Sequence, residues 1–160
     1  MTTEELVAKI GAAFEPGAGL DLEAVVEHWC ENCEDVARAF AGRAWPEISA
    51  EAIDSHYSSL PLLTPAAFRQ ILPAYMVRGL QRPADFTGLN DVSEFTTYML
   101  LPEEVSPWWT DRVKAFSPEQ NDAVYEFVLE MLARRADYFA ESDLAAMSHW
   151  AEGRGRRTKG

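Results

Sequence analysis

The stretch "TPAAFRQILPAYM", residues 64–76, decides the fold, because it joins a helix start signal to a helical apolar face. Thr64 is a suitable N-cap, and Pro65 suits the first helical position, where its missing N–H costs nothing. Apolar side chains then recur at spacings of three and four residues: Phe68, Ile71, Leu72, Tyr75 and Met76. The pattern predicts a helix with one buried face, and Pro73 predicts a kink within it.

Similar signals on both sides of this stretch predict further helices. Thr2 and Glu5 form a capping-box pair, and "SPEQ" at 117–120 places serine, proline and glutamine at the N-cap, N1 and N3 positions. Asp21 suits the N-cap of a helix over 22–40. Its apolar stripe would consist of Leu22, Val25, Val26, Trp29, Cys33, Val36, Ala37 and Phe40. With a short helix after Ser49 and a last one ending near Trp150, the sequence predicts a mainly α-helical bundle of five or six helices.

Residues 82–116 are the exception to the helical pattern. "FTTYMLL", residues 95–101, fits a short strand or an extended buried segment, and periodicity does not decide between them. We therefore expect one irregular or short-β segment here. An irregular stretch of this length is often functional, so Trp108 and Trp109 either fill the core beneath a loop or anchor a partner.

The composition predicts a single folded domain. The chain has 160 residues, of which 48% are apolar and 11% aromatic. This length and apolar content are enough for a hydrophobic core, so we expect one domain over residues 1–152. A disordered basic tail, 153–160, should follow it. It contains no apolar run of membrane-spanning length, and "MTTEELVAKIGAAF" lacks the basic region of a secretory signal. A cytoplasmic protein with two reduced cysteines is the expectation, with no role at a membrane.

The chain carries a formal net charge of −12, and four of its cations, Arg154, Arg156, Arg157 and Lys159, lie in the tail. The body is therefore still more acidic. Such a surface repels the phosphates of nucleic acids and favours the capture of a basic protein, although the charge also serves solubility alone.

Both cysteines lie in "HWCENCED", residues 28–35. A W-C-x-x-C motif is typical of the active-site helix of thioredoxin-like enzymes. In those proteins it follows a buried strand, whereas residues 22–30 have a helical period. A thiol oxidoreductase that uses Cys30 and Cys33 is thus the main alternative to a binding function, and small buried residues in a helix are the expected role.

A metal site at the same place requires more ligands than the sequence supplies. On a straight helix His28 and Cys33 would lie roughly 140° apart around the axis. The other histidines, His56 and His149, belong to no second cluster. The sequence therefore predicts no metal, no cofactor and no catalytic residue.

The polar face of the predicted 22–40 helix carries acids at helical spacing: Glu23, Glu27, Glu31, Glu34 and Asp35. Like charges at such spacing destabilise a helix by a few tenths of a kcal/mol each. They form either a solvated face or a docking surface for Lys and Arg on a partner. Together with Trp108 and Trp109, these acids are the candidate partner-binding residues.

Three stretches resemble a family of small acidic bacterial proteins known only as a domain of unknown function. They are "RAWPEI" (43–48), "LTPAAFRQILPAYM" (63–76) and "FSPEQNDAVYEFVLEML" (116–132), and the likeness spans about residues 20–135. Proteins of this kind are similar in character to immunity proteins, which block the product of a neighbouring toxin gene. The resemblance implies a non-enzymatic immunity protein or antitoxin that binds a basic toxin. A scaffold or regulatory subunit is a further alternative.

Overall fold

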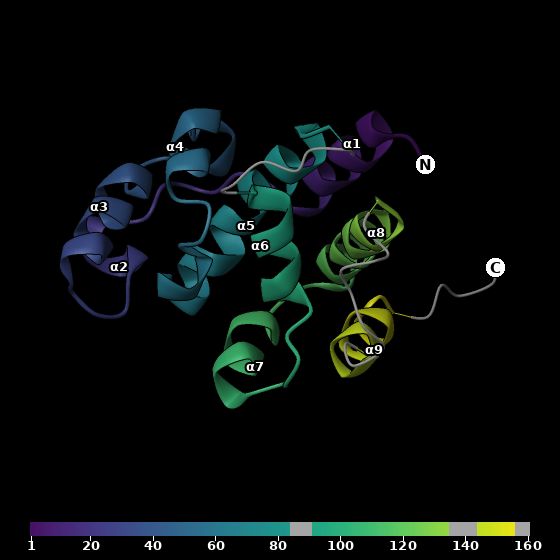
Figure 1. The fold of residues 1–160 in the computed structure, drawn as a ribbon. Helices are drawn as coiled ribbons and strands as arrows, with labels where there is room; N and C mark the ends of the chain where they lie inside the picture. The colour runs from purple at the N-terminus through teal and green to yellow at the C-terminus, as the bar shows by residue number, and fades with distance from the viewer. Residues whose placement is uncertain (84–90, 135–143, 156–160) are drawn as a thin grey trace.

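A computed structural model of the protein describes residues 1–83, 91–134 and 144–155, and the structure below refers to these ranges. They contain nine α-helices, two short 3-10 helices and no sheet (Figure 1). The helices are α1 (Thr3–Ala13), α2 (Leu22–Val25), α3 (Glu31–Phe40), η1 (Trp45–Glu47), α4 (Ala50–Ser55), η2 (Leu60–Leu62), α5 (Pro65–Gln81), α6 (Val92–Leu100), α7 (Pro107–Val113), α8 (Pro118–Arg134) and α9 (Leu144–Gly153). The predicted mainly α-helical single domain is confirmed, with more helices than expected. None of the helices in these ranges is long and apolar enough to cross a membrane.

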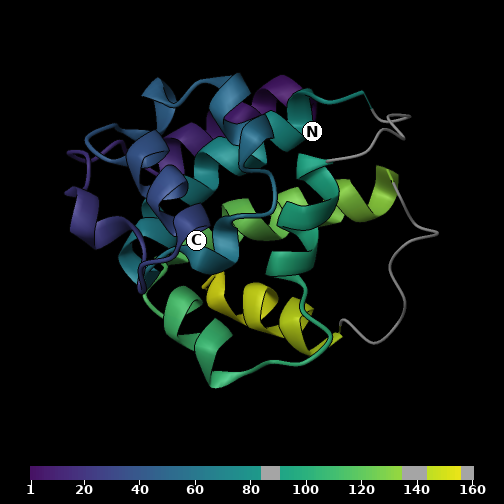
Figure 2. The ribbon, with the colours of Figure 1, turned by 60° about the vertical axis from the view of Figure 1, so that its left-hand side comes forward.

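The helix predicted from residues 64–76 is α5, and it lies at the centre of the molecule. It packs against α1, α6 and α7, as both views show (Figures 1 and 2). The Thr64 hydroxyl accepts a hydrogen bond from the Ala67 amide at 3.1 Å and donates one to the Ala24 carbonyl at 2.7 Å. Its N-cap therefore also ties α5 to α2. The helix continues through Pro73, which is buried within it.

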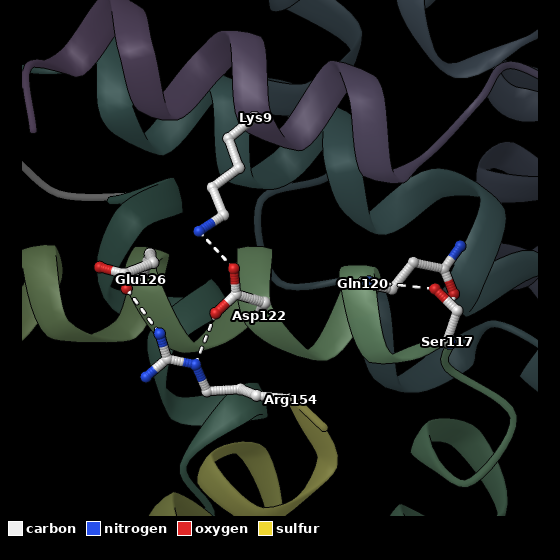
Figure 3. Close-up of polar contacts among 6 residues, drawn as sticks. All are labelled: Lys9, Ser117, Gln120, Asp122, Glu126 and Arg154. Carbon is white, nitrogen blue, oxygen red and sulfur yellow. Dashed lines mark hydrogen bonds and ion pairs between the residues drawn. The ribbon is translucent and has the colours of Figure 1, made fainter. Parts of the chain in front are cut away.

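The predicted cap of α8 is confirmed, and α8 joins both ends of the described chain. The Ser117 hydroxyl accepts from the Gln120 amide, while the Gln120 side chain accepts from the Ser117 amide at 3.0 Å. One turn along, Asp122 pairs with Lys9 of α1 and, at 2.5 Å, with Arg154 (Figure 3). Arg154 was predicted to lie in a disordered tail but is thus docked on α8. Residues 156–160 of the predicted tail lie outside the described ranges.

The helix predicted over 22–40 is divided into α2 and α3 by a non-helical segment, residues 26–30, which bends at Glu27 and His28. Val26 forms an isolated antiparallel bridge with Leu63, and the Val25 carbonyl accepts from the Thr64 amide at 3.0 Å. Val25 and Val26 are adjacent β-branched residues, which have little preference for a helix. Pairing with a distant segment therefore determines the backbone conformation here, despite the helical spacing of the apolar residues.

Within residues 82–116, the described part is largely helical. Residues 95–101, for which we expected a strand or an extended segment, lie in α6 and at its C-cap. The Asp91 side chain caps this helix by accepting from the Ser93 amide at 2.9 Å. Buried positions then follow at spacings of three and four residues, including Thr96 and Leu100. The β-branched threonines concealed this helical period, and residues 84–90 lie outside the described ranges.

The core between α6, α7 and α9 is built on two tryptophans. Trp109 of α7 and Trp150 of α9 are both buried, and their ring centroids lie 5.6 Å apart. Their indole N–H groups donate to the carbonyls of Met99 and Leu100 at 2.8 and 2.7 Å. Each large apolar ring is therefore buried without an unsatisfied donor.

The ion pair between α4 and α5 generates a pH prediction. Arg78 donates two hydrogen bonds to Asp54, at 2.9 and 2.7 Å, and these bonds hold the pKa of Asp54 below its usual value. A carboxyl group with a lowered folded-state pKa contributes stability above its unfolded pKa of about 3.9, and that stability is lost as the pH falls through the folded pKa.

We expect Asp54→Asn to lower the free energy of unfolding at pH 7 by about 1 kcal/mol, because the pair is partly solvated. The difference from the wild type should shrink below about pH 4. Urea unfolding at a series of pH values measures it, with Glu51→Gln on the same helix as the control. A difference that stays constant down to pH 2 would contradict this account.

Candidate functional site

The segment of residues 26–30 presents three consecutive exposed side chains. Val26 is buried and paired with Leu63, whereas Glu27, His28 and Trp29 are exposed. The buried Val26 and its bridge to Leu63 attach the start of this non-helical segment to the core. Cys30 ends the segment as the N-cap of α3.

The Arg112 side chain links this segment to α7. Only 2% of it is exposed, and its Nη2 lies 3.0 Å from a carboxylate oxygen of Glu27. The same nitrogen donates to the Leu63 carbonyl at 2.9 Å. The guanidinium also stacks on Trp108, 3.8 Å from the ring centroid. A buried cation requires such partners, since the cost of removing it from water is several kcal/mol.

The five predicted acids extend over three successive elements rather than along one helix. Glu23 lies on α2, Glu27 on the 26–30 segment, and Glu31, Glu34 and Asp35 on α3. Two of them are used within the fold, since Glu27 pairs with Arg112 and Glu34 pairs with Arg38 at 2.5 Å. The structure brings the five to one region but leaves only part of the set for a partner.

The remaining three acids, Glu23, Glu31 and Asp35, are exposed. Within the described ranges none of them forms an ion pair. Asp35 does act on His56: burial lowers the pKa of this histidine, and the Asp35 carboxylate opposes the shift. The three acids thus retain charge that a basic partner can neutralise.

The two predicted tryptophans occupy different environments. Trp108 is 36% exposed, whereas Trp109 is 2% exposed and belongs to the core. Trp109 therefore fills the core, whereas the ring of Trp108 is partly accessible at the surface.

Trp29 is 56% exposed, in contrast to its predicted place on the apolar stripe of a helix. The Val25-Val26 pair was the available signal that the helix is interrupted before it. Glu27, two residues earlier, pairs with the arginine that stacks on Trp108. The segment that carries Trp29 is therefore fixed to the helix that carries Trp108.

The two cysteines form a disulfide at the start of α3, which corrects the prediction that they are reduced. Cys33, in the first turn, is fully buried, as expected, and Cys30 is partly buried. The Cys33 amide donates to Cys30 Sγ at 3.1 Å. After reduction, the same amide and the helix dipole would stabilise a thiolate at Cys30.

His28 lies closer to the cysteines than the sequence analysis predicted. Each of His28, Cys30 and Cys33 places one potential ligand atom within 4.8 Å of the other two. The prediction of a wide angular separation was wrong because residues 26–30 are not helical. A disulfide consumes both thiolates, and a tetrahedral zinc site needs a fourth ligand, so the three alone do not form a closed structural site.

These observations define a small helical domain with an exposed aromatic and acidic segment that leads into a disulfide. The chain belongs to a family of unknown function, DUF6714, whose model matches residues 2–154. This confirms the resemblance to an uncharacterised family, and the family supplies no activity. No curated protein and no solved structure matches the chain.

Proposed function

We propose that the protein is a non-enzymatic acidic module that binds a basic protein partner. Binding would take place at a surface composed of Glu23, Trp29, Glu31, Asp35 and Trp108, named here the Trp29/Trp108 surface. One observation carries the proposal: the elements that present two exposed tryptophans are joined by the Glu27–Arg112 pair, beside acids that have no basic partner in the described ranges.

The two residue types contribute differently to such binding. A tryptophan buries a large rigid area at a low cost in conformational entropy, and tryptophan is enriched among residues that dominate binding energy. Exposed carboxylates mainly raise the association rate and select a basic partner. In a chain of net charge −12, the acids would attract the partner and the tryptophans would hold it.

Within this proposal, the most specific role is that of a cytoplasmic immunity protein or antitoxin. The active sites of toxins that act on nucleic acids are basic, because they bind phosphates. An acidic module can block such a site by covering it. A scaffold or regulatory subunit would use the same surface without a toxin.

Charge reversal tests the surface. We expect Glu31→Lys with Asp35→Lys to reduce low-salt capture of the partner about tenfold, because two attractive charges become repulsive. The measurement is recovery of a single stoichiometric basic protein from the source lysate by the tagged chain, followed by affinity measurement on the purified pair. Glu27 is left unchanged because it pairs with Arg112.

The matched control is Glu119→Lys with Glu152→Lys, which changes the net charge equally. Both control residues are exposed, and they lie on α8 and α9, on the other side of the molecule from α3 (Figure 1). Trp108→Ala should weaken binding at high salt as well as at low salt. Equal losses of affinity from the two charge reversals would show a general effect of net charge. They would contradict the proposed role of the Trp29/Trp108 surface in binding.

The position of the disulfide favours a second candidate function, thiol–disulfide exchange. In the reduced protein, the Cys30 thiolate would attack a disulfide of a substrate protein and release one substrate thiolate. Cys33 would then attack Cys30 Sγ, release the second substrate thiol and leave the Cys30–Cys33 disulfide. The substrate gains the two electrons that the cysteine pair loses.

Single cysteine variants test this second function. With reduced protein and insulin as a disulfide substrate, Cys33→Ser should accumulate a mixed disulfide at Cys30, because the resolving thiol is missing. Cys30→Ser should accumulate none, since Cys33 is fully buried. Non-reducing electrophoresis detects the adduct. If reduced wild type cleaves insulin disulfides no faster than Cys30→Ser, the candidate is eliminated.

A further inference from the structure

Arg43 and Arg69 differ from the other lysines and arginines in the described ranges because they lack an ion pair. All the others pair with at least one carboxylate: Lys9, Arg38, Arg78, Arg82, Arg112, Lys114, Arg134 and Arg154. Arg43 and Arg69 form no ion pair within those ranges. This is unexpected in a chain with 26 acidic and 14 basic residues. Both unpaired arginines line the same pocket.

The pocket has a volume of about 160 Å³ and lies where the loop after α1 meets α5 and the turn after α3. Phe14, Phe40 and Ile71 give it apolar walls, and all three are buried. Gln70 and Gln120 also line it. The pocket therefore combines apolar surface with cationic and amide donors, which is the usual character of a small-molecule site.

Both guanidinium groups donate to backbone carbonyls and leave donors unused. Arg43 Nη1 donates to the Ala39 and Arg38 carbonyls at the end of α3, at 2.6 and 3.2 Å. Arg69 Nη1 donates to the Ala115 carbonyl at 3.4 Å. A guanidinium has five N–H donors, so both arginines retain donors for a ligand.

Close backbone contacts and hydrogen bonds hold the loop after α1 against the turn after α3. A Cβ on Gly19 would lie 2.2 Å from the Gly42 carbonyl carbon and 2.4 Å from the Arg43 nitrogen, so the two backbones are in direct contact. The Gly42 amide also donates to the Leu20 carbonyl at 2.8 Å. Trp45 adds a bond between side chain and backbone, from its Nε1 to the Phe14 carbonyl at 2.8 Å. The pocket is therefore formed before any ligand arrives, which reduces the entropy cost of binding.

We propose that this pocket binds a small organic monocarboxylate with an aromatic or branched apolar group, its carboxylate paired with Arg43 and Arg69. Arginine matches a carboxylate geometrically, because its N–H groups form a planar fork. The volume suits one ring, since a cavity of about 150 Å³ accommodates benzene. Glu15 also lines the pocket and is exposed, so its charge disfavours a dianion such as phosphate.

This site is independent of the Trp29/Trp108 surface, because no residue of that surface lines the pocket. It adds a small-molecule binding site to a protein from a family of unknown function. Loss of partner binding would not affect it, and loss of the carboxylate site would not affect the partner surface.

Phenylacetate is a suitable probe, titrated into the full chain by calorimetry and followed by NMR. We expect saturable binding in the millimolar range and a shift of the Trp45 indole N–H signal, which arises from the pocket wall. Arg69→Gln should weaken binding about tenfold or more, because it removes a charge-assisted hydrogen bond. Neutral phenylacetamide should bind at least about tenfold more weakly than phenylacetate for the same reason.

The matched control is Arg38→Gln, which removes an equal charge from α3 at a residue that does not line this pocket. It should bind phenylacetate like the wild type. Arg43→Gln also loses bonds to the end of α3, so Arg69→Gln, with its fold verified by circular dichroism, is the decisive variant. Absence of saturable binding, equal affinity of Arg69→Gln and wild type, or equal affinity for the neutral amide would each overturn the proposal.

Discussion

The buried guanidinium of Arg112 is the interaction on which the arrangement of the candidate site depends. It lies at the junction of three segments that are distant in sequence: the 26–30 segment, the end of η2 and α7. Glu27, the Leu63 carbonyl and the Trp108 ring are its partners. Removing one partner of a buried charge costs much more than losing a surface ion pair, because the remaining charge is left without solvation. The same contacts link the segment that carries Trp29 to the helix that carries Trp108.

The pairing of cations in this acidic chain leaves an acidic surface in one region and a cationic pocket in another. Most of the described lysines and arginines are used within the fold, as Arg154 shows by joining Asp122 and Glu126 on α8 (Figure 3). The excess acids remain at the surface, and Glu31 of α3 follows the exposed Trp29 by two residues. Among the described lysines and arginines, Arg43 and Arg69 of the pocket are the two that form no ion pair. The molecule therefore offers one region suited to a basic macromolecule and another suited to a small anion.

Both candidate functions proposed for the surface use the 26–30 segment, since Trp29 directly precedes Cys30. They make different demands on it. Binding a basic partner requires Trp108 and the acids of α3 and is indifferent to the chemistry of sulfur. Thiol–disulfide exchange requires Cys30 to be accessible after reduction and Cys33 to be close to it, whatever the charge of the neighbouring acids. The separation of these requirements allows single variants to distinguish the two functions.

The sequence predicted those features that depend on residues a few positions apart. The caps at Thr64 and Ser117 and the apolar face of α5 are local, and all were correct. The break after Val25 was not predicted because it depends on pairing with Leu63, far along the chain. This one break also explains the errors over Trp29 and His28, since both were placed on a helix that ends before them. The helix α6 was missed because its threonines have β propensity, and packing decided its structure.

Amide hydrogen exchange in Arg112→Met tests the central claim most directly, because methionine keeps much of the apolar bulk and removes the charge. If Arg112 holds the 26–30 segment against α7, exchange should accelerate about tenfold or more at the Thr64 amide, which bonds to Val25, and at the Thr110 amide in α7. The Phe14 amide at the end of α1, which bonds to Ile10, should exchange as in the wild type. Unchanged exchange at Thr64 and Thr110 would show that the segment is held without Arg112 and would contradict the account.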